Sequence, residues 1–347
     1  MLSRRIAILG LCFCFAWLTG LGSVHAAPPR VDLELILDAG AAIDGPRDWI
    51  DMLKDLGFSN LKVRNGQRGD VAEIRQVGSD ERPAYMVTGI ISSGNVLKLP
   101  GGNFRLGDKT GVKTWKEKLQ DGGKDEIFAE KVMFGLTGKQ MLSLRDELKG
   151  TVNFATKGES SKEMLRKLGN QLRIDLAAEG KAANAVRSEE PVLDEFQGLS
   201  YGTALVGILR PLGCVMIPEK RSGSEMRLLV RDSSEVEKPW PVGWELRVSP
   251  VKVAPDYFKT TNVEITDFVL ADALNAIQKR VNLPFLYDHN NMLRQRVEIG
   301  QVKVSSKKGR RAYSSVIDEI LYQAKLKSEI RVDEADRPFL WITTLKQ

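Results

Sequence analysis

Hydrophobic and polar residues alternate most clearly in the C-terminal third of the chain. Two amphipathic helices are predicted there, the first after a cap at Thr266 and the second around Ile317. Residues 328–344 are predicted to form a closing hairpin. The order is therefore strand, helix, strand, strand, helix, hairpin. The predicted single strands are TNVEI (261–265), NLPFLYD (282–288) and RVEIGQVKVS (296–305).

The middle third repeats this order. Ser160 and Ser200 are placed to cap its two helices, and residues 214–232 form the closing hairpin around a Ser-Gly-Ser turn. Apolar positions of its first helix recur 109 residues later, and those of its second helix recur 112 residues later. A loop can absorb the difference, so we expect two copies of one unit. Its single strands are predicted at 151–158, 173–179 and 192–200.

The N-terminal part carries an α+β pattern with a different spacing. VDLELILDAG (31–40) predicts a strand, and Gly45-Pro46 places a proline in the first turn of a helix. The predicted fold class is α+β, with two tandem small βαββαββ modules, whose helices pack on a sheet, preceded by a further α+β domain. The predicted boundaries are 1–26 for a signal peptide, 31–125 for the N-terminal domain, 126–236 for the first module, 237–258 for a connector rich in Pro and Trp, and 259–347 for the second module.

The connector is too rich in aromatic residues for a flexible linker, so we expect it to be ordered and extended. Trp240 and Trp244 lie within it. Two interpretations are about equal at this point: the indoles pack the modules together, or they fill a local core.

The first residues have the features of a secretory signal. Arg4 and Arg5 precede an apolar stretch, and Val24-His25-Ala26 ends in small residues where cleavage is expected. Retention as an anchor is the rival interpretation, but the stretch is short for a bilayer span and is broken by glycines. We therefore expect a periplasmic or secreted protein with no integral membrane span after cleavage. Cys12 and Cys14 would leave with the signal, so Cys214 would have no disulfide partner in the mature chain.

Charge narrows the expected partners. The net charge is +6, and the basic and acidic residues are interspersed along the chain. This distribution is typical of a solvated surface and not of a nucleic-acid-binding face, so we expect no nucleic acid as partner.

Several segments resemble the short N-terminal domain of secretins and TonB-dependent receptors. The matching pieces of the second module are LADALNAI (270–277), NLPFLYD (282–288), VEIGQVKVS (297–305), YSSVIDEIL (313–321) and FLWITT (339–344), and the first module is a more distant match. The layout with PWPVGW and YDHNN is also similar to exported proteins of planctomycete-type bacteria. No pore, plug or barrel is predicted, so the resemblance implies only contacts with other envelope proteins, such as secretin or outer-membrane components.

His289 and Cys214 are the residues with the chemistry of a catalytic or metal site. A zinc site needs three or four ligands, and these two lie 75 positions apart in different modules. A Ser-His-Asp triad would need a nucleophile elbow, which the chain lacks. We therefore interpret His289 as part of a turn where a strand ends and Cys214 as a buried apolar residue, and we predict no metal and no cofactor.

The sequence favours a non-catalytic exported scaffold or binding protein. Its contact elements are predicted to be the hairpins 214–232 and 328–344 and the connector. Two alternatives remain: glycan binding by Trp240, Trp244 and Trp341, and an acid-based hydrolase using pairs such as Glu189-Glu190 or Asp125-Glu126. The candidate contact residues are Trp240, Trp244, Tyr287, His289, Phe339 and Trp341.

Overall fold

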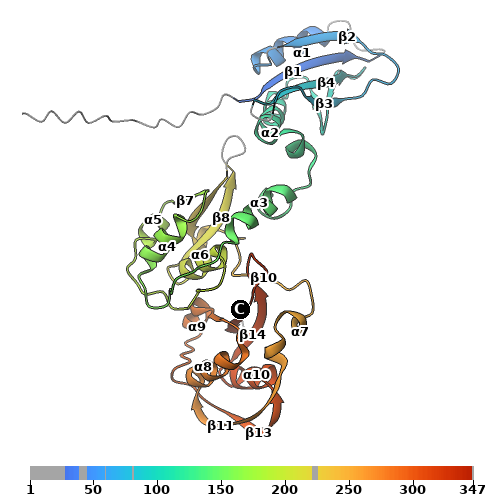
Figure 1. Ribbon diagram of the computed structural model, residues 1–347. Coiled ribbons are helices and arrows are strands. Elements are labelled where there is room, and N and C mark those ends of the chain that lie inside the picture. The colour runs from blue at the N-terminus through green and yellow to red at the C-terminus, as the bar shows by residue number, and fades with distance from the viewer. Residues whose placement is uncertain (1–27, 39–44, 59, 80–81, 221–225, 346–347) are drawn as a thin grey trace, which may run out of the picture.

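The computed structural model describes residues 28–38, 45–58, 60–79, 82–220 and 226–345. The predicted signal peptide (1–26) and the Ser-Gly-Ser turn at 222–224 lie outside these residues. The fold is mixed α+β, as predicted, and its helices lie against several separate small sheets (Figure 1). No helix in the described ranges has the length and apolarity needed to cross a bilayer.

The N-terminal domain is built on one six-stranded sheet. Its order is β2-β1-β4-β5-β6, with β3 paired to β4. The strands β2 and β4 lie parallel to β1 on either side of it. Pro46 stands in the first turn of α1, as predicted, and Asp108 caps α2. The elements are β1 (Arg30–Leu37), α1 (Gly45–Asp55), β2 (Leu61–Asn65), β3 (Glu73–Gln76), β4 (Ala84–Ile91), β5 (Val96–Leu99), β6 (Gly102–Arg105) and α2 (Lys109–Phe128).

The first module is formed by helices on a three-stranded sheet of order β7-β9-β8. The Ser160 and Ser200 side chains accept hydrogen bonds from the N-terminal turns of α4 and α6, so both predicted caps are confirmed. The elements are η1 (Met133–Gly135), α3 (Gly138–Leu148), α4 (Ser161–Gly169), β7 (Asp175–Ala178), α5 (Ala182–Ala185), α6 (Tyr201–Leu209), β8 (Cys214–Lys220), β9 (Met226–Asp232) and η2 (Ser233–Glu235).

The strands predicted at 151–158 and 192–200 are wrong. These segments lie side by side, and the Val152 amide donates to the Leu199 carbonyl at 2.9 Å, but only isolated bridges form. Gly158 and Gly198 have φ values of 84° and 89°. Such left-handed residues interrupt an extended ladder, which is the physical reason for the difference.

The second module places its helices between two sheets. The helix α10 packs against both β13 and β14, and α8 packs against β11 (Figure 1). The larger sheet has the order β10-β14-β15-β12, and β11 and β13 form a two-stranded antiparallel ribbon. The elements are β10 (Trp244–Glu245), α7 (Pro250–Val253) and η3 (Pro255–Phe258) in the connector, then β11 (Thr260–Val269), α8 (Leu270–Val281), β12 (Phe285–Tyr287), α9 (His289–Arg294), β13 (Lys303–Ala312), α10 (Tyr313–Gln323), β14 (Leu326–Val332) and β15 (Pro338–Thr344).

Two predicted boundaries in the second module are wrong. The third strand was expected at 296–305, but β13 begins at Lys303, after a turn in which Arg296 has a φ of 54°. The helix α8 begins at Leu270 and not after Thr266, because β11 continues to Val269 through two irregularities in its pairing with β13.

The sheets of the two modules share their order and directions. In the first, β9 lies between parallel β7 and antiparallel β8. In the second, β15 lies between parallel β12 and antiparallel β14. The irregular pair 151–158 and 192–200 holds the place in the chain that β11 and β13 hold in the second module.

Cys214 begins β8 and is 2 % exposed. Burial, together with the nearby charge of Asp232, raises the pKa of its thiol, so the reactive thiolate is disfavoured. In a variant that begins at Ala27, where Cys214 is the one remaining cysteine, we expect a thiol reagent such as DTNB to label Cys214 about a hundredfold more slowly in native buffer than in denaturant. Equal labelling rates, followed by absorbance, would contradict the buried assignment.

Candidate functional site

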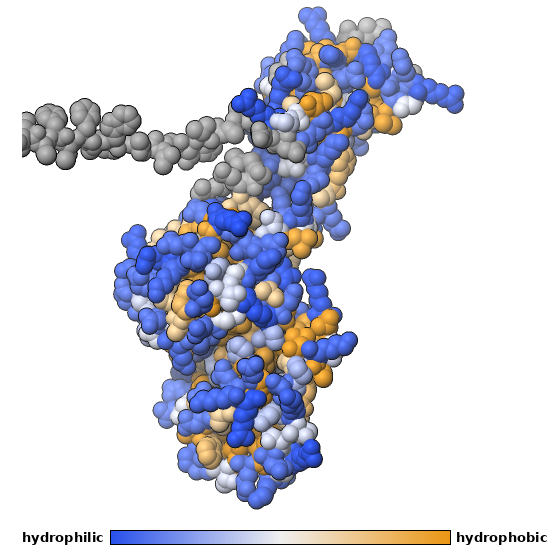
Figure 2. All heavy atoms as spheres, in the orientation of Figure 1, coloured by the Kyte–Doolittle hydropathy of each residue, from blue (hydrophilic) through white to orange (hydrophobic). Residues whose placement is uncertain are grey.

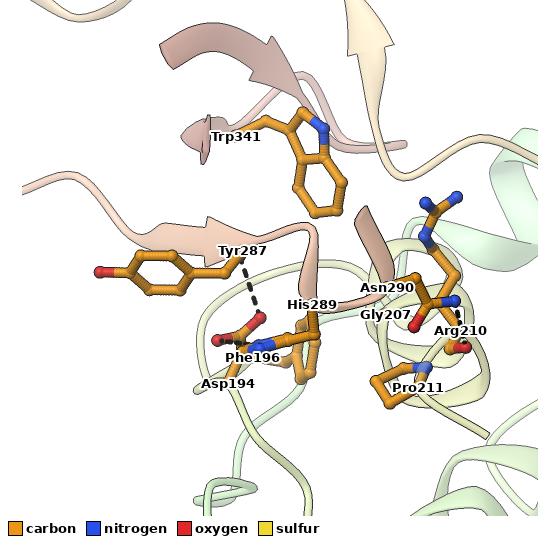
Figure 3. A pocket seen from close by; sticks show the side chains of 9 residues that line it. All are labelled: Asp194, Phe196, Gly207, Arg210, Pro211, Tyr287, His289, Asn290 and Trp341. Carbon is orange, nitrogen blue, oxygen red and sulfur yellow. Dashed lines mark hydrogen bonds and ion pairs between the residues drawn. The ribbon is translucent and has the colours of Figure 1, made fainter. Parts of the chain in front are cut away.

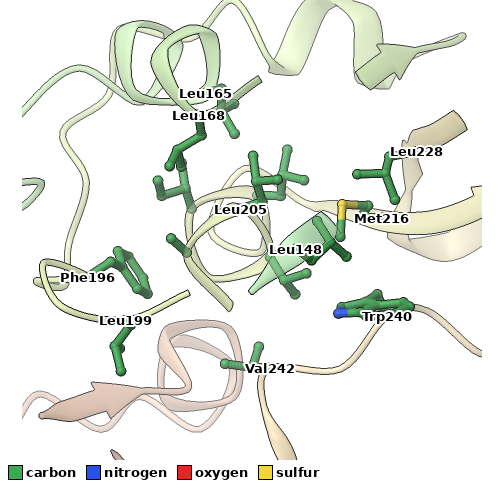
Figure 4. Close-up of a cluster of buried hydrophobic side chains, with 14 of the residues drawn as sticks. Leu148, Leu165, Leu168, Phe196, Leu199, Leu205, Met216, Leu228, Trp240 and Val242 are labelled. Carbon is green, nitrogen blue, oxygen red and sulfur yellow. The ribbon is translucent and has the colours of Figure 1, made fainter. Parts of the chain in front are cut away.

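The aromatic residues selected from the sequence come together at the junction of the two modules. Trp240, Phe339 and Trp341 belong to one continuous hydrophobic core with helices and strands of the first module. Figure 4 shows Trp240 and Val242 beside Leu148 and Met216 of that module. Of the two interpretations of the connector tryptophans, the structure therefore supports packing between the modules.

The rings of Trp240, Phe339 and Trp341 are too deeply buried to form an external binding surface. Trp240 is 1 % exposed, Phe339 0 % and Trp341 4 %. Trp244 is partly buried and meets Trp240 edge-on at a centroid distance of 5.1 Å. Stacking on a sugar needs an open ring face, so the predicted glycan platform of Trp240, Trp244 and Trp341 is not formed.

A turn of the second module binds the N-terminus of a helix in the first. The turn lies between β14 and β15, and the helix is α6. Asp333 Oδ2 accepts a hydrogen bond from the Ser200 amide at 2.8 Å. Glu334 Oε2 accepts from the Thr203 amide at 3.0 Å and from the Thr203 hydroxyl at 2.9 Å. Carboxylates at this end of a helix satisfy unpaired N–H groups and interact favourably with the helix dipole.

The Glu334 carboxylate accepts further hydrogen bonds, although the residue is only 4 % exposed. The Ser200 hydroxyl donates to it, and so do Trp240 Nε1 at 2.7 Å and Trp244 Nε1 at 3.4 Å. Among the residues that the structure describes, no lysine or arginine forms an ion pair with Glu334. Its negative charge is thus stabilised by hydrogen bonds and by the helix end, and the tryptophan N–H groups are satisfied by the same carboxylate.

Asp333 and Arg337 complete the turn. Asp333 is fully buried, and burial raises the pKa of its carboxyl, although Arg337 opposes the rise. Arg337 Nε lies 3.1 Å from Asp333 Oδ2. Its Nη1 donates to the Gly198 carbonyl at 2.7 Å, and its Nη2 donates to the Lys149 carbonyl at 3.0 Å. One arginine of the second module therefore joins two segments of the first.

His289 lies in a second polar contact between the modules, shown in Figure 3. Its Nε2 is 3.0 Å from Asp194 Oδ1, and the Tyr287 amide donates to Asp194 Oδ2 at 3.1 Å. Burial and the Asp194 charge raise the pKa of the Tyr287 phenol. Beside this group, Arg210 forms an ion pair with Asp288 at 2.9 Å. The hollow lined by these side chains has about 10 Å³ of free volume, space for a single water molecule.

The structure corrects part of the interpretation of His289. The strand does end there, at Tyr287. However, His289 is the first residue of the short helix α9, which Asp288 caps, and does not lie in a turn. Its imidazole contacts the other module. This contact gives His289 a structural role at the junction.

Three of the four acids considered for a hydrolase, Glu189, Glu126 and Asp125, form ion pairs with lysines. Glu189 accepts from Lys162 and Ser160, which lower the pKa of its carboxyl. Burial would raise the pKa of Glu126, but Lys131 and Lys220 outweigh it and lower the pKa. A general acid needs a raised pKa, so Glu189 and Glu126 lack the property that this role requires.

Comparison with known proteins gives no relative to set beside this geometry. No family model, no curated protein and no solved structure matches the chain. In the described part of the chain, no group of three or more His, Cys, Asp or Glu side chains is placed to hold a metal ion. The resemblance to the short N-terminal domain of secretins stays a prediction.

Sequence reasoning missed the residues that join the modules: Asp194, Asp333, Glu334 and Arg337. The stretch DEADRP (333–338) lies within the predicted hairpin 328–344, where its polar residues are typical of a turn. One signal was present, because Gly202 stands in the first turn of a predicted helix where other residues have higher helix propensity. Its reason is close approach, since a Cβ there would lie 2.5 Å from Glu334 Cδ.

Replacing Gly202 tests this approach. An alanine normally favours a helix over glycine, but Gly202→Ala should lower the free energy of unfolding by about 1–3 kcal/mol, because its methyl group overpacks against Glu334. Gly138→Ala is the matched control, since a Cβ at that position in the first turn of α3 meets nothing within 4 Å. Denaturant unfolding of both variants measures the difference, and an equal or higher stability of Gly202→Ala would contradict it.

Truncating Glu334 tests the hydrogen bonds themselves. Glu334→Ala leaves Trp240 Nε1 and the Thr203 amide without their acceptor, so we expect a loss of about 2–5 kcal/mol. Glu334→Gln keeps one acceptor oxygen and should lose less. The exposed Glu245→Ala should change stability by less than about 0.5 kcal/mol. Calorimetry should also show the single transition of the two modules splitting in Glu334→Ala, and three identical profiles would refute the assigned role.

Proposed function

We propose that the chain is a non-catalytic exported scaffold or binding protein that acts through protein–protein contacts in the cell envelope, in a process such as secretion or outer-membrane assembly. Two features support this proposal. The candidate aromatic residues and His289 lie at the contact between the modules. This contact holds the two modules together as one unit that can present a surface. Secretin or outer-membrane components are the partners that the resemblance implies.

The observation that carries the proposal is the ribbon of β11 and β13. In the described residues these strands pair only with each other. The Gln323 side chain covers part of the β13 edge, because it accepts from the Ser305 amide at 3.1 Å and donates to the Ser305 carbonyl at 2.8 Å. The edge of β11 has no strand beside it other than β13 in the described ranges. An open edge of this kind can accept a strand from a partner.

The outer face of the ribbon is hydrophilic and largely basic. Lys307 and Arg310 are exposed on β13, and Figure 2 shows hydrophilic side chains at the lower end of the molecule, where the ribbon lies. Lys303 and Lys308 are exposed too, but they form ion pairs with Asp267 and Glu264 of β11. An acidic partner segment would therefore find attractive charge beside an open edge.

This assignment replaces one of the contact elements predicted from the sequence. Hairpin 328–344 contains β15, which lies between β14 and β12 inside the larger sheet. Hairpin 214–232 keeps an edge strand, β8, although the Trp240 amide donates to the Met216 carbonyl on it at 2.8 Å. Deletion of 328–344 would remove part of the core, so point variants on the ribbon are the sharper test.

Affinity capture from intact envelopes, read by mass spectrometry, tests the proposal. The double variant Lys307→Glu with Arg310→Glu should reduce recovery of the specific partner by about tenfold, because two attractive charges become repulsive. Lys113→Glu with Lys118→Glu on the exposed side of α2 is the control with the same change in net charge. Capture of the same proteins in equal amounts by the parent and both variants would contradict the role of the ribbon.

A further inference from the structure

The N-terminal domain is joined to the first module by a short piece of chain and shares no core with it. Figure 1 shows this domain at one end of the molecule, with α2 leading down to α3. Its hydrophobic core extends along α2 to Leu119 and the partly buried Ile127. In the described ranges, this core has no side chain in common with the cores of the two modules. Domains without a large apolar interface are expected to move relative to one another.

The connecting segment has the features of a hinge. The helix α2 ends at Phe128, and Ala129 is extended, with φ −72° and ψ 135°. The turn that follows is attached to the modules, because Phe134 stacks on Trp240 at a centroid distance of 5.5 Å. A change of backbone angles at Ala129 and Glu130 would therefore rotate the domain against the modules.

Apolar side chains beside this hinge are left exposed. Phe128, Val132 and Met133 are between 47 and 59 % exposed. The packing of these large side chains therefore contributes little to the orientation of the domain, and polar contacts have to hold it.

The carboxylate of Glu126 supplies such a contact. Its side chain lies near the end of α2 and is 7 % exposed. Lys131 Nζ donates to its Oε1, and Lys220 Nζ, at the end of β8, lies 3.4 Å from its Oε2. Gln140 Nε2 donates to Oε2 at 3.2 Å, and Gln140 Oε1 accepts from the Thr137 amide at 2.8 Å. Lys131, Gln140 and Lys220 all lie outside the N-terminal domain, so the carboxylate joins the domain to the first module.

The charges favour this contact at neutral pH. Burial would raise the pKa of Glu126, but Lys131 and Lys220 outweigh burial and lower it, so the carboxyl is ionised. Hydrogen bonds between ionised groups are stronger than neutral ones. Asp125 and Lys139 join the same two parts of the chain at 3.4 Å, but their side chains are 62 and 85 % exposed, and exposed pairs contribute little.

We propose that Glu126 is an electrostatic latch that holds the N-terminal domain in the described orientation, and that opening of this latch lets the domain rotate about residues 129–130. Opening exposes Glu126 and its lysines to water, which compensates for part of the lost attraction, so the latch is reversible. The inference goes beyond the proposed function, because it concerns a domain that lies apart from the ribbon. A scaffold with such a hinge presents its N-terminal domain in more than one position.

A distance between two spin labels tests this inference in the chain that begins at Ala27. Ser93→Cys in the N-terminal domain and Gln171→Cys in the first module are exposed labelling positions, and Cys214→Ala removes the native thiol. At about 0.1 M salt, double electron–electron resonance should give one narrow distribution of distances. At about 1 M salt the distribution should become about twofold broader, because the Debye length falls from about 10 Å to about 3 Å.

Variants of two adjacent acids separate the latch from a general effect of charge. Glu126→Gln should be as broad at low salt as the parent is at high salt, because the ion pairs with Lys131 and Lys220 are lost. Asp125→Asn is the matched control, since it loses the same charge from an exposed pair and should stay narrow.

Three results would overturn the inference: a broad parent distribution at low salt, a narrow distribution in folded Glu126→Gln, or equal broadening in Asp125→Asn and Glu126→Gln. Circular dichroism shows whether each variant is folded. If Glu126→Gln is unfolded, the folded parent decides the question, and a width that does not change with salt overturns the inference.

Discussion

The carboxylates of Asp333 and Glu334 on the N-terminus of α6 are the interaction on which the arrangement of the two modules depends. A helix leaves its first N–H groups without partners, and here another module supplies the acceptors. Gly202 lets the carboxylate approach, and both connector indoles donate to it. The same few atoms thus cap a helix, accept hydrogen bonds from two indole N–H groups and fix the position of one module on the other.

A buried carboxylate without a cation is costly unless hydrogen bonds compensate for the lost water. Glu334 meets this requirement with hydroxyl, amide and indole donors from both the first module and the connector. If the modules separated, the carboxylate would regain water, but the indoles would expose a large apolar surface. This coupling of polar and apolar contacts explains why the aromatic residues belong to a joint and leave no platform for external ligands.

A fixed joint also determines which surfaces remain for recognition. The ribbon of β11 and β13 lies on the opposite side of α10 from the larger sheet, so its outer face is free of the joint. A cleft of about 430 Å³ at the end of α8, in contrast, is lined by residues of the first module, the connector and the second module. One surface is a property of the second module, and the other is a property of the assembled pair.

The sequence by itself determined the α+β class, both closing hairpins, and the caps at Ser160 and Ser200, because these features depend on local periodicity and on side chains that bond to nearby backbone. The sequence also indicated Trp240, Phe339 and His289 as candidate contact residues, but it did not indicate which residues they contact. Only the tertiary structure decided that Glu334 meets Thr203 and that His289 meets Asp194, since those contacts join positions far apart in the chain. It also decided that 151–158 and 192–200 stay irregular, where glycines in the left-handed conformation override an extended pattern.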